Sequence, residues 1–382
     1  MKFLFNENNI KNLYHIYNNI KMIKFFKLFS FVATLAIVAN SQIFHPDSSV
    51  IERFKNWVET HRIIARDDYH LVHMFDNWLS NDKFIFETNT KNLTYTVGHN
   101  AFSGMNSDEF YEFMGFKANT DLLAKGSGFL RGYDTTVQQE RIMDLENLPI
   151  NIDWRTKGVV SDIRTQSQCG SCYAFSAVST LESAIAIKTG KLYDLSEQEI
   201  VSCSVKYGNL KCNGGYYNSV WNFVKDNNGI CSESDYPYTS GNGDGGSCIK
   251  ECTPVSGTKV QSYVDVTSNS DTAMMTALTV GPISIAIEAD QKSFQLYNSG
   301  IYSDYEGCNA NSKTNGIDTQ PNIDHAVVLV GYGSENGQDY YILRNSWDTS
   351  WGENGYMRII RGSKYGPYGV CGVLYDPMYP VV

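Results

Sequence analysis

Two cysteines three residues apart are the first candidates for chemistry in this sequence. Cys169 and Cys172 lie in the stretch TQSQCGSCYAFSAVSTLESA, residues 165–184. Two thiols at this spacing can form a redox-active disulfide, supply half of a metal site, or combine a structural cysteine with a reactive one. The surrounding sequence discriminates between these three possibilities.

The redox and metal alternatives find little support nearby. A thioredoxin-like pair is expected after a strand and within a βαβ pattern, but the preceding residues VVSDIRTQSQ are polar and typical of a turn. A zinc site needs two further ligands at close spacing, and the sequence contains no second C-x-x-C and no H-x3-H. The neighbouring residues therefore favour a nucleophilic cysteine beside a structural one.

A nucleophilic cysteine needs a base. The residues CYAFSAVSTLESAIAIKTG predict a helix that begins at Cys172 and stops at Gly190, and the N-terminal end of a helix favours a thiolate. Six of the seven histidines precede residue 148, which leaves His325, beside Asp324, in the cysteine-containing part. A lone histidine is more often a core residue than a base, so on its own this pairing remains a hypothesis.

The elements that must position these residues change in type along the chain. SEQEIVSCS predicts a second helix, with a capping box formed by Ser196 and Glu199. After Gly281 the runs PISIAIEA, HAVVLVGYG, DYYILRNSW and GYMRIIRG predict short strands. Helices followed by strands indicate an α+β unit with two halves, and a site is expected in the cleft between them.

The region before residue 148 forms a second, different unit. All nine cysteines lie after residue 168. Residues 50–89 carry large apolar side chains at helical spacing and predict two amphipathic helices. Residues 95–104 predict a short strand, NSDEFYEFMGF a brief helix, and residues 117–147 a linker.

Residues 22–42 are typical of a secretory signal peptide, with lysines, an apolar run and small residues in order. We interpret Met22 as the initiator. A secretory route permits disulfides, and an odd number of cysteines predicts at least one free thiol. The formal net charge of -10 argues against a nucleic-acid partner, and no other segment predicts a membrane helix.

Four motifs in order resemble the papain-like cysteine proteases of the cathepsin L type. QCGSCYAFS resembles the nucleophile signature of that family. CNGGYY resembles its substrate-binding loop, NIDHAVVLVGYG contains the expected histidine, and RNSWDTSWGENGY resembles its asparagine motif. The resemblance implies a two-lobed fold with a helical left lobe, a β-barrel-like right lobe and an active-site cleft between them, preceded by a helical propeptide.

The resemblance assigns four catalytic roles. Cys172 would attack the scissile carbonyl as a thiolate, and His325 would hold the proton as an imidazolium and deliver it to the leaving amine. Asn345 would orient the imidazole. Gln166 would place a side-chain N–H beside the Cys172 main-chain N–H as an oxyanion hole. Trp347 would shield the histidine–asparagine hydrogen bond from water.

The resemblance also pairs the cysteines. It implies bridges between Cys169 and Cys212, Cys203 and Cys248, and Cys308 and Cys371. For the two that remain, Cys231 and Cys252, we predict a fourth bridge, which leaves Cys172 free.

The resemblance also assigns residues to substrate binding. The main chain of Gly214 and Gly215 should pair with an extended substrate. The residues expected around the substrate are Gly214, Gly215, Tyr216, Tyr217, Ala286, Ile323, Asp324, Ala326, Trp347 and Asp376. Most are apolar or aromatic, which implies a hydrophobic preference at the second residue before the cut. Asp376 would either bind a basic side chain at the pocket floor or be a solvated C-terminal acid.

Some positions depart from the usual pattern of the family. Ser167 and Gln168 stand where Gly-Ser is usual, and Asp348 where Gly is usual. In the N-terminal region, His70 and Met74 replace an expected Glu and Arg, and Gly104 replaces an expected Asp.

These inferences divide the chain into an N-terminal extension and signal peptide (1–41), an inhibitory propeptide (42–147) and a mature peptidase domain (148–382). The expected function is a lysosomal, vacuolar or secreted cysteine endopeptidase, made as a zymogen, with no cofactor and no metal. Its expected partners are protein and peptide substrates, its own propeptide and cystatin-like inhibitors, and a monomer is expected. A catalytically silent binding relative and a redox enzyme with bonded Cys169 and Cys172 are the alternatives.

Overall fold

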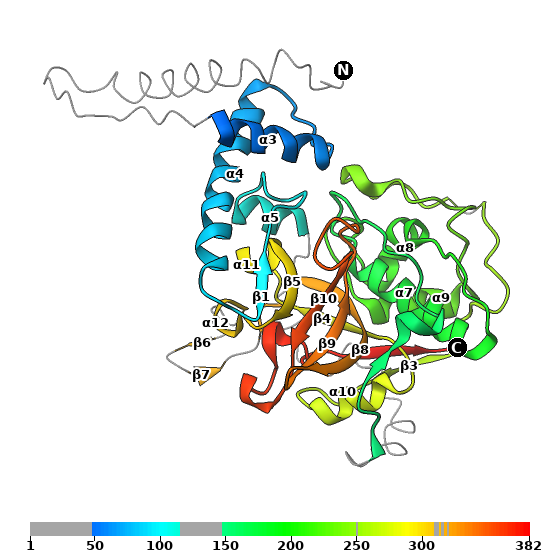
Figure 1. Cartoon of the computed structure of the whole chain (residues 1–382). Coiled ribbons are helices and arrows are strands. Elements are labelled where there is room, and N and C mark those ends of the chain that lie inside the picture. The colour runs from blue at the N-terminus through cyan, green and yellow to red at the C-terminus, as the bar shows by residue number, and fades with distance from the viewer. Residues whose placement is uncertain (1–47, 115–146, 250, 309–312, 315–316, 319–320) are drawn as a thin grey trace, which may run out of the picture. The chain divides into compact units, whose positions relative to one another are not determined.

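The computed structural model describes residues 48–114, 147–249, 251–308, 313–314, 317–318 and 321–382 (Figure 1). The expected signal peptide and most of the expected linker lie outside these ranges. The chain divides into two compact units. The first contains the described residues up to Lys91 together with Gly98–Asn106, and the second contains Asn92–Val97 and the residues from Ser107 onward.

The first unit is built on two helices, α3 (Ser48–Thr60) and α4 (Asp68–Asn89). Asp67 begins α4 by accepting a hydrogen bond from the main-chain N–H of His70. Apolar residues at helical spacing meet in one buried cluster that contains Phe54, Phe75 and Trp78. The two amphipathic helices expected for residues 50–89 are therefore confirmed.

The second unit contains the other helices of the described residues. Figure 1 shows α7, α8 and α9 gathered beside the strands of a large sheet. The α-helices are α5 (Ser107–Met114), α7 (Cys172–Thr189), α8 (Glu197–Cys203), α9 (Tyr217–Asp226), α10 (Asp271–Leu278), α11 (Lys292–Gln295) and α12 (Tyr305–Cys308). Short 3-10 helices are η2 (Trp154–Lys157), η3 (Ser204–Tyr207), η4 (Ser240–Asn242), η5 (Ser363–Tyr365) and η6 (Val370–Gly372).

Helix α7 is the central helix of this unit. It is buried along most of its length, and Gly190 ends it in the left-handed conformation at φ 75°. Glycine adopts this conformation without the steric cost that a Cβ atom would add. The helix expected from Cys172 to Gly190 is confirmed.

The large sheet follows the order β1-β5-β10-β9-β8-β4-β11-β3, and β2 pairs with β8. The strands are β1 (Tyr95–Val97), β2 (Ile152–Asp153), β3 (Ser262–Asp265), β4 (Ile283–Ile287), β5 (Tyr297–Tyr302), β8 (His325–Glu335), β9 (Gln338–Arg344), β10 (Tyr356–Ile360) and β11 (Met378–Val381). Strands β6 (Lys313–Thr314) and β7 (Ile317–Asp318) form a separate pair. The four runs expected as strands are β4, β8, β9 and β10. The path ends at β1 and β3, so the sheet is open rather than a closed barrel.

The strand expected over residues 95–104 ends at Val97. Beyond it, the Asn100 side chain accepts a hydrogen bond from the Phe102 N–H, and the Asn100 N–H donates to Ser103 Oγ. These local bonds compete with strand pairing. The chain turns here instead of extending the strand.

The capping box expected at α8 is only half formed. Ser196 Oγ accepts from the Glu199 N–H at 3.0 Å. The Glu199 carboxylate does not return to Ser196. It accepts instead from the Cys231 N–H (2.7 Å) and from the Asn227 amide (3.1 Å). Hydrogen bonds to Cys231 and Asn227 therefore replace the bond from Glu199 to Ser196 that would complete the capping box.

Four disulfides cross-link segments within the second unit. They are Cys169–Cys212, Cys203–Cys248, Cys231–Cys252 and Cys308–Cys371, the same four pairs that the sequence analysis expects. Cys172 is a free, buried thiol. Within the described ranges, no helix combines the length and the apolar character needed to cross a membrane.

Candidate active site

Cys172 is the first residue of α7, and its thiol is fully buried. The main-chain groups of Ala326 and Tyr173 lie near enough to the sulfur to favour its charged form. Cys172 and Ala326, the second residue of β8, lie in the same buried cluster, so the thiol is near the start of that strand. Because Cys169 is bonded to Cys212, the redox alternative, which needs a Cys169–Cys172 bond, is contradicted.

His325 is the first residue of β8 and is also fully buried. Its Nε2 lies 2.8 Å from Oδ1 of Asn345. An amide oxygen only accepts, so Nε2 carries the hydrogen and the neutral ring has its lone pair on Nδ1. Nδ1 is shielded from solvent and has no hydrogen-bond partner among the described residues. The ring stacks on Trp347, with centroids 4.6 Å apart and an interplanar angle of 22°.

The sheet register brings these residues together. Ile287 of β4 pairs with His325 of β8, and Val328 of β8 pairs with Arg344, the last residue of β9. Asn345 follows directly and donates its main-chain N–H to Gly355. Two antiparallel neighbours in this register place His325 and Asn345 at the same end of the sheet.

Burial acts against the thiolate–imidazolium pair that the resemblance implies. Burial raises the pKa of the Cys172 thiol to about 12, against the main-chain N–H groups that favour the thiolate. Burial lowers the pKa of His325 to about 4, although the hydrogen bond to Asn345 acts in the opposite direction. Desolvation in the described structure therefore favours the thiol and the neutral imidazole over the ion pair.

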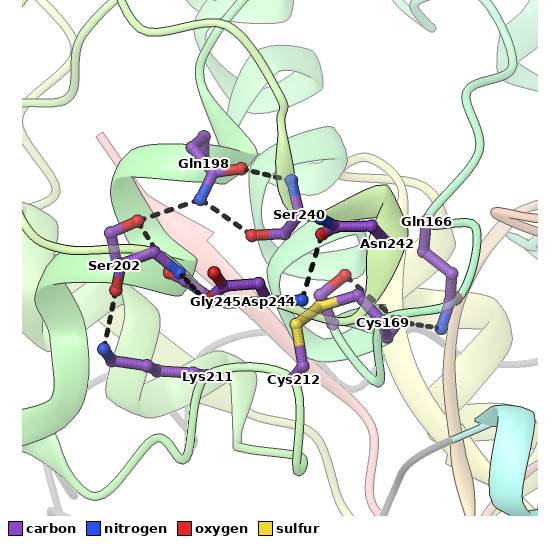
Figure 2. Close-up of a disulfide and its surroundings, with 12 residues drawn as sticks. Gln166, Cys169, Gln198, Ser202, Lys211, Cys212, Ser240, Asn242, Asp244 and Gly245 are labelled. Atoms are coloured by element: carbon purple, nitrogen blue, oxygen red, sulfur yellow. Dashed lines mark hydrogen bonds between the residues drawn. A yellow bond between two sulfur atoms is a disulfide. The ribbon is translucent and has the colours of Figure 1, made fainter. Parts of the chain in front are cut away.

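Gln166 is buried, and hydrogen bonds fix both its side-chain and its main-chain polar atoms. Its Nε2 donates to the Cys169 carbonyl at 2.9 Å (Figure 2), and its Oε1 accepts from Ser346 Oγ at 2.7 Å. Its main-chain N–H donates to the Ser346 carbonyl at 3.0 Å. A carboxamide nitrogen carries two hydrogens. One is used by Cys169, which leaves the second available as a donor.

Two departures from the usual family pattern lie close to this site. Ser167 has φ 49° and Asp348 has φ 68°, both in the left-handed region. Glycine is the residue that enters this region at no steric cost. At Asp348, the carboxylate accepts from the N–H and hydroxyl of Thr349, which supports the conformation locally.

The two glycines expected to bind substrate, Gly214 and Gly215, differ in whether their main-chain groups already form hydrogen bonds. The Gly214 N–H donates to the Gly170 carbonyl, and its own carbonyl accepts from the Leu210 N–H. Gly215 makes no main-chain hydrogen bond with the described residues. A Cβ atom there would lie 2.4 Å from Asn209 Oδ1. Gly214 uses both main-chain groups within the protein, whereas those of Gly215 remain available for the expected pairing.

The apolar candidates lie in one cluster. Tyr217, Ala286, Ile323 and Ala326 are buried in the same group of residues as Cys172, with Tyr216 packed against it. Ala286 of β4 and Ala326 of β8 are direct partners in the sheet.

Asp376 is half-buried rather than fully solvated. The Tyr217 hydroxyl is within hydrogen-bond distance of the Asp376 main-chain oxygen and lies 2.8 Å from its Oδ2. The structure therefore brings two of the expected substrate-binding residues into contact with each other.

Asp324 is buried, and one of its carboxylate oxygens accepts from the Ala289 N–H at 2.7 Å. The other oxygen is shielded and has no partner among the described residues. Burial, with the negative charge of Asp290 nearby, raises the pKa of Asp324 well above its ordinary value. Burial therefore disfavours the charged form of this carboxyl.

Two contributors to the site were missed by the sequence analysis. Ser346 supplies both a hydroxyl and a carbonyl to Gln166, and its place inside the RNSW motif was the available signal. Phe110 of α5 is fully buried with its ring edge-on to Trp347, at 5.3 Å between centroids. No pattern in the sequence links these two residues.

A buried thiol beside a histidine oriented by an asparagine defines a cysteine hydrolase site. Comparison with known proteins agrees with this geometry. Residues 148–381 match the papain family of cysteine proteases, and residues 54–110 match the cathepsin propeptide inhibitor domain I29. The chain belongs to the papain family of cysteine proteases, and it is a proenzyme with its own inhibitory propeptide.

Related proteins are found in plants and insects. Cysteine proteinase COT44 of Brassica napus is 38% identical over 309 residues, covering 80% of this chain and 88% of the relative. The probable cysteine protease RD21B of Arabidopsis thaliana is also 38% identical, over 80% of this chain, which spans only 60% of that relative. The solved structure of digestive procathepsin L 3 from the larval midgut of Tenebrio molitor superposes with a TM-score of 0.73 at 32% identity, covering 88% of this chain and all of that one.

Proposed function

We propose that this protein is a cysteine endopeptidase in which Cys172, His325, Asn345 and Gln166 carry out peptide-bond hydrolysis. The arrangement that supports this most directly is His325, joined to Asn345 at 2.8 Å with Nδ1 unpartnered among the described residues. That nitrogen is a ready proton acceptor for a thiol at the start of α7. The free state of Cys172 beside four disulfides supports the same role.

The reaction follows from this arrangement. The Cys172 proton moves to His325 Nδ1, and the sulfur attacks the scissile carbonyl carbon. The negative charge on the former carbonyl oxygen is stabilised by the second Nε2 hydrogen of Gln166 and the Cys172 N–H. The imidazolium then protonates the leaving amine, and water hydrolyses the thioester with His325 as base.

Substrate preference is proposed from the apolar cluster. Tyr217, Ala286, Ile323 and Ala326 would contact an apolar or aromatic side chain two residues before the cut. Asp376 would extend the preference to basic side chains, with its carboxylate oriented by Tyr217. If Asp376→Ala leaves the ratio of Arg to Leu cleavage at that position unchanged, the second part of this proposal is wrong.

The remaining assignments concern processing and location. We propose residues 42–147 as the inhibitory region and 148–382 as the mature enzyme, with a secretory route to a lysosome, a vacuole or the exterior. Protein substrates and cystatin-like inhibitors are the proposed partners of a monomeric mature form.

The test is acid incubation of the purified proenzyme, followed by assay on fluorogenic Phe-Arg and Leu-Arg amides with and without a thiol-alkylating epoxide. We expect turnover that the epoxide abolishes, with the modification mapped to Cys172. Cys172→Ser is the matched control and should be inactive. Turnover that persists in Cys172→Ser would overturn the assignment of the nucleophile.

A further inference from the structure

Tyr238 contacts both ends of the short stretch, Gln166 to Cys172, that supplies the proposed oxyanion hole. Its hydroxyl donates to the main-chain carbonyl of Gln166 at 2.8 Å. The same oxygen lies 2.9 Å from Oγ of Ser171, the residue directly before Cys172. Because the Tyr238 hydrogen is used on a carbonyl that can only accept, Ser171 donates to Tyr238 in this pair.

The Ser171 side chain is placed unusually for its position. Ser171 is the N-cap residue of α7, where a serine hydroxyl usually accepts from a main-chain N–H of the first turn. Here it forms no such capping bond. The buried hydroxyl lies 2.9 Å from the Tyr238 oxygen and, more distantly, 3.4 Å from the Cys169 carbonyl oxygen. Helix α7 therefore lacks the side-chain capping bond, and the Ser171 hydroxyl contacts Tyr238 instead.

The surroundings hold the phenol in one place. Its ring lies edge-on to Phe175 of α7, with centroids 5.1 Å apart at 77°. The Tyr238 N–H donates to the Glu233 carboxylate at 2.7 Å. Burial raises the pKa of the phenol, so it stays protonated and remains a donor across the working pH range.

We propose that Tyr238 is a positioning residue for the oxyanion hole, because its hydroxyl joins the Gln166 main chain to the residue that precedes Cys172. The two proposed donors, Gln166 Nε2 and the Cys172 N–H, lie at opposite ends of the short stretch from Gln166 to the first residue of α7. A shared hydroxyl limits their relative movement, and donors placed in advance stabilise a developing charge most strongly. This inference rests on the proposed function of Gln166.

The test removes the hydroxyl alone, with Tyr238→Phe, which retains the ring and its contact with Phe175. The measured quantities are kcat and KM on a dipeptide amide, per active site titrated with the epoxide, so that misfolded protein does not count. We expect kcat to fall about three- to tenfold, as for the loss of one hydrogen bond, with KM within about twofold. The alkylation rate with iodoacetamide should not change, because that displacement forms no oxyanion.

The matched control is Tyr236→Phe, two residues away. Its hydroxyl accepts from the Ile249 N–H and contacts the Ser247 carbonyl, and neither partner belongs to the site. This variant should retain kcat within about twofold.

A double-variant cycle completes the test. Gln166→Ala alone should lower kcat by about 100-fold or more, and adding Tyr238→Phe to it should change kcat further by less than about twofold. An unchanged kcat in Tyr238→Phe, or a parallel fall in the iodoacetamide rate, would overturn the positioning role. An unchanged kcat in Gln166→Ala would overturn the proposed function of Gln166, and with it this inference.

Discussion

At the scale of single residues, the protonation of Cys172 and His325 depends on how deeply they are buried. Both side chains are fully buried in a structure that includes α5 of the propeptide. Solvent access would reduce the desolvation that raises one pKa and lowers the other. The main-chain N–H groups around the sulfur would then favour the thiolate.

We therefore predict that propeptide removal activates the thiol itself. Iodoacetamide should alkylate Cys172 of the activated enzyme at pH 6 at least about tenfold faster than in the proenzyme, since one pKa unit changes the thiolate fraction about tenfold. The rates are measured by mass spectrometry of the peptide that contains Cys172. Equal rates in the two forms would show that burial does not control the nucleophile.

Backbone conformation at Ser167 leads to a second residue-scale prediction. A non-glycine residue in the left-handed region costs about 1 kcal/mol or more, and φ at Ser167 is 49°. Ser167→Gly should raise the free energy of unfolding by up to about 1 kcal/mol. Ser167→Ala retains the Cβ atom and serves as the control in urea denaturation of the proenzyme. A gain of the same size in Ser167→Ala would rule out backbone strain as the cause.

At the scale of elements, α5 is the part of the propeptide with described contacts at the site. Phe110 packs edge-on against Trp347, which in turn stacks on His325. We predict that Phe110→Ala weakens inhibition, because truncating a buried phenylalanine typically costs about 3 to 5 kcal/mol. The variant proenzyme should become active at acidic pH with a shorter lag than the wild type. Glu112→Ala, on the exposed side of α5, should retain the wild-type lag.

The first unit lacks the carboxylate that the family usually has at position 104. A Cβ atom on Gly104 would lie 2.8 Å from the ring of Trp57, so the packing leaves no room for an aspartate. A different group near the same turn can respond to acid. His99 stacks on Trp78 with centroids 4.4 Å apart, and its Nε2 lies 3.1 Å from Asp82.

Protonation of His99 is opposed by its surroundings. Burial lowers the pKa of His99, more strongly than the bond to Asp82 raises it, and the charges of Arg53 and His61 act in the same direction as burial. Nδ1 is shielded and has no partner among the described residues. Burial also opposes ionisation of Asp82, but its bonds to Arg53 and His99 outweigh burial and hold its pKa below the ordinary value.

The sign of the pH dependence follows. The unfolded histidine has a pKa of about 6.5, so the contribution of a neutral His99 is complete above that pH. This contribution to the free energy of unfolding is lost as the pH falls below about 6.5, by up to about 1.4 kcal/mol per pH unit. The stabilising contribution of Asp82 is retained until the pH falls below about 4.

We predict that hydrogen exchange of α4 accelerates between pH 7 and 5, after correction for intrinsic rates. The experiment uses the full Cys172→Ser proenzyme, which cannot process itself. His99→Gln should flatten this pH dependence. An unchanged slope in His99→Gln would assign acid sensing to another group.

At the scale of the whole molecule, the proposed boundary between propeptide and mature enzyme lies in an accessible segment. Asn147 is exposed, and Ile150 is 86% exposed. Immediately before it, the Pro149 carbonyl accepts a hydrogen bond from the Tyr332 hydroxyl at 2.8 Å. Strand β2 then pairs with β8 from Ile152 onward. Proteases cleave exposed chain more readily than paired chain.

We predict that acid activation produces a mature N-terminus within one or two residues of Leu148. N-terminal sequencing of the activated protein measures this directly. A mature chain that begins after Asp153 would have lost β2, and would contradict the boundary.

The sequence by itself determined the features that depend on neighbouring residues. The motif around Cys172, the helix that stops at Gly190 and the β-rich C-terminal part follow from local periodicity and glycine conformation, so they were predictable without a structure. The order of the motifs also indicated the family, and thereby His325, Asn345 and Gln166.

Only the tertiary structure decided features that depend on segments far apart in the chain. The neutral thiol and imidazole, the half-formed capping box at Glu199 and the bond from Tyr238 to Gln166 all arise from burial or from contacts across long separations. Desolvation and long-range hydrogen bonds depend on which atoms exclude water from a group. That information exists only when the chain is folded.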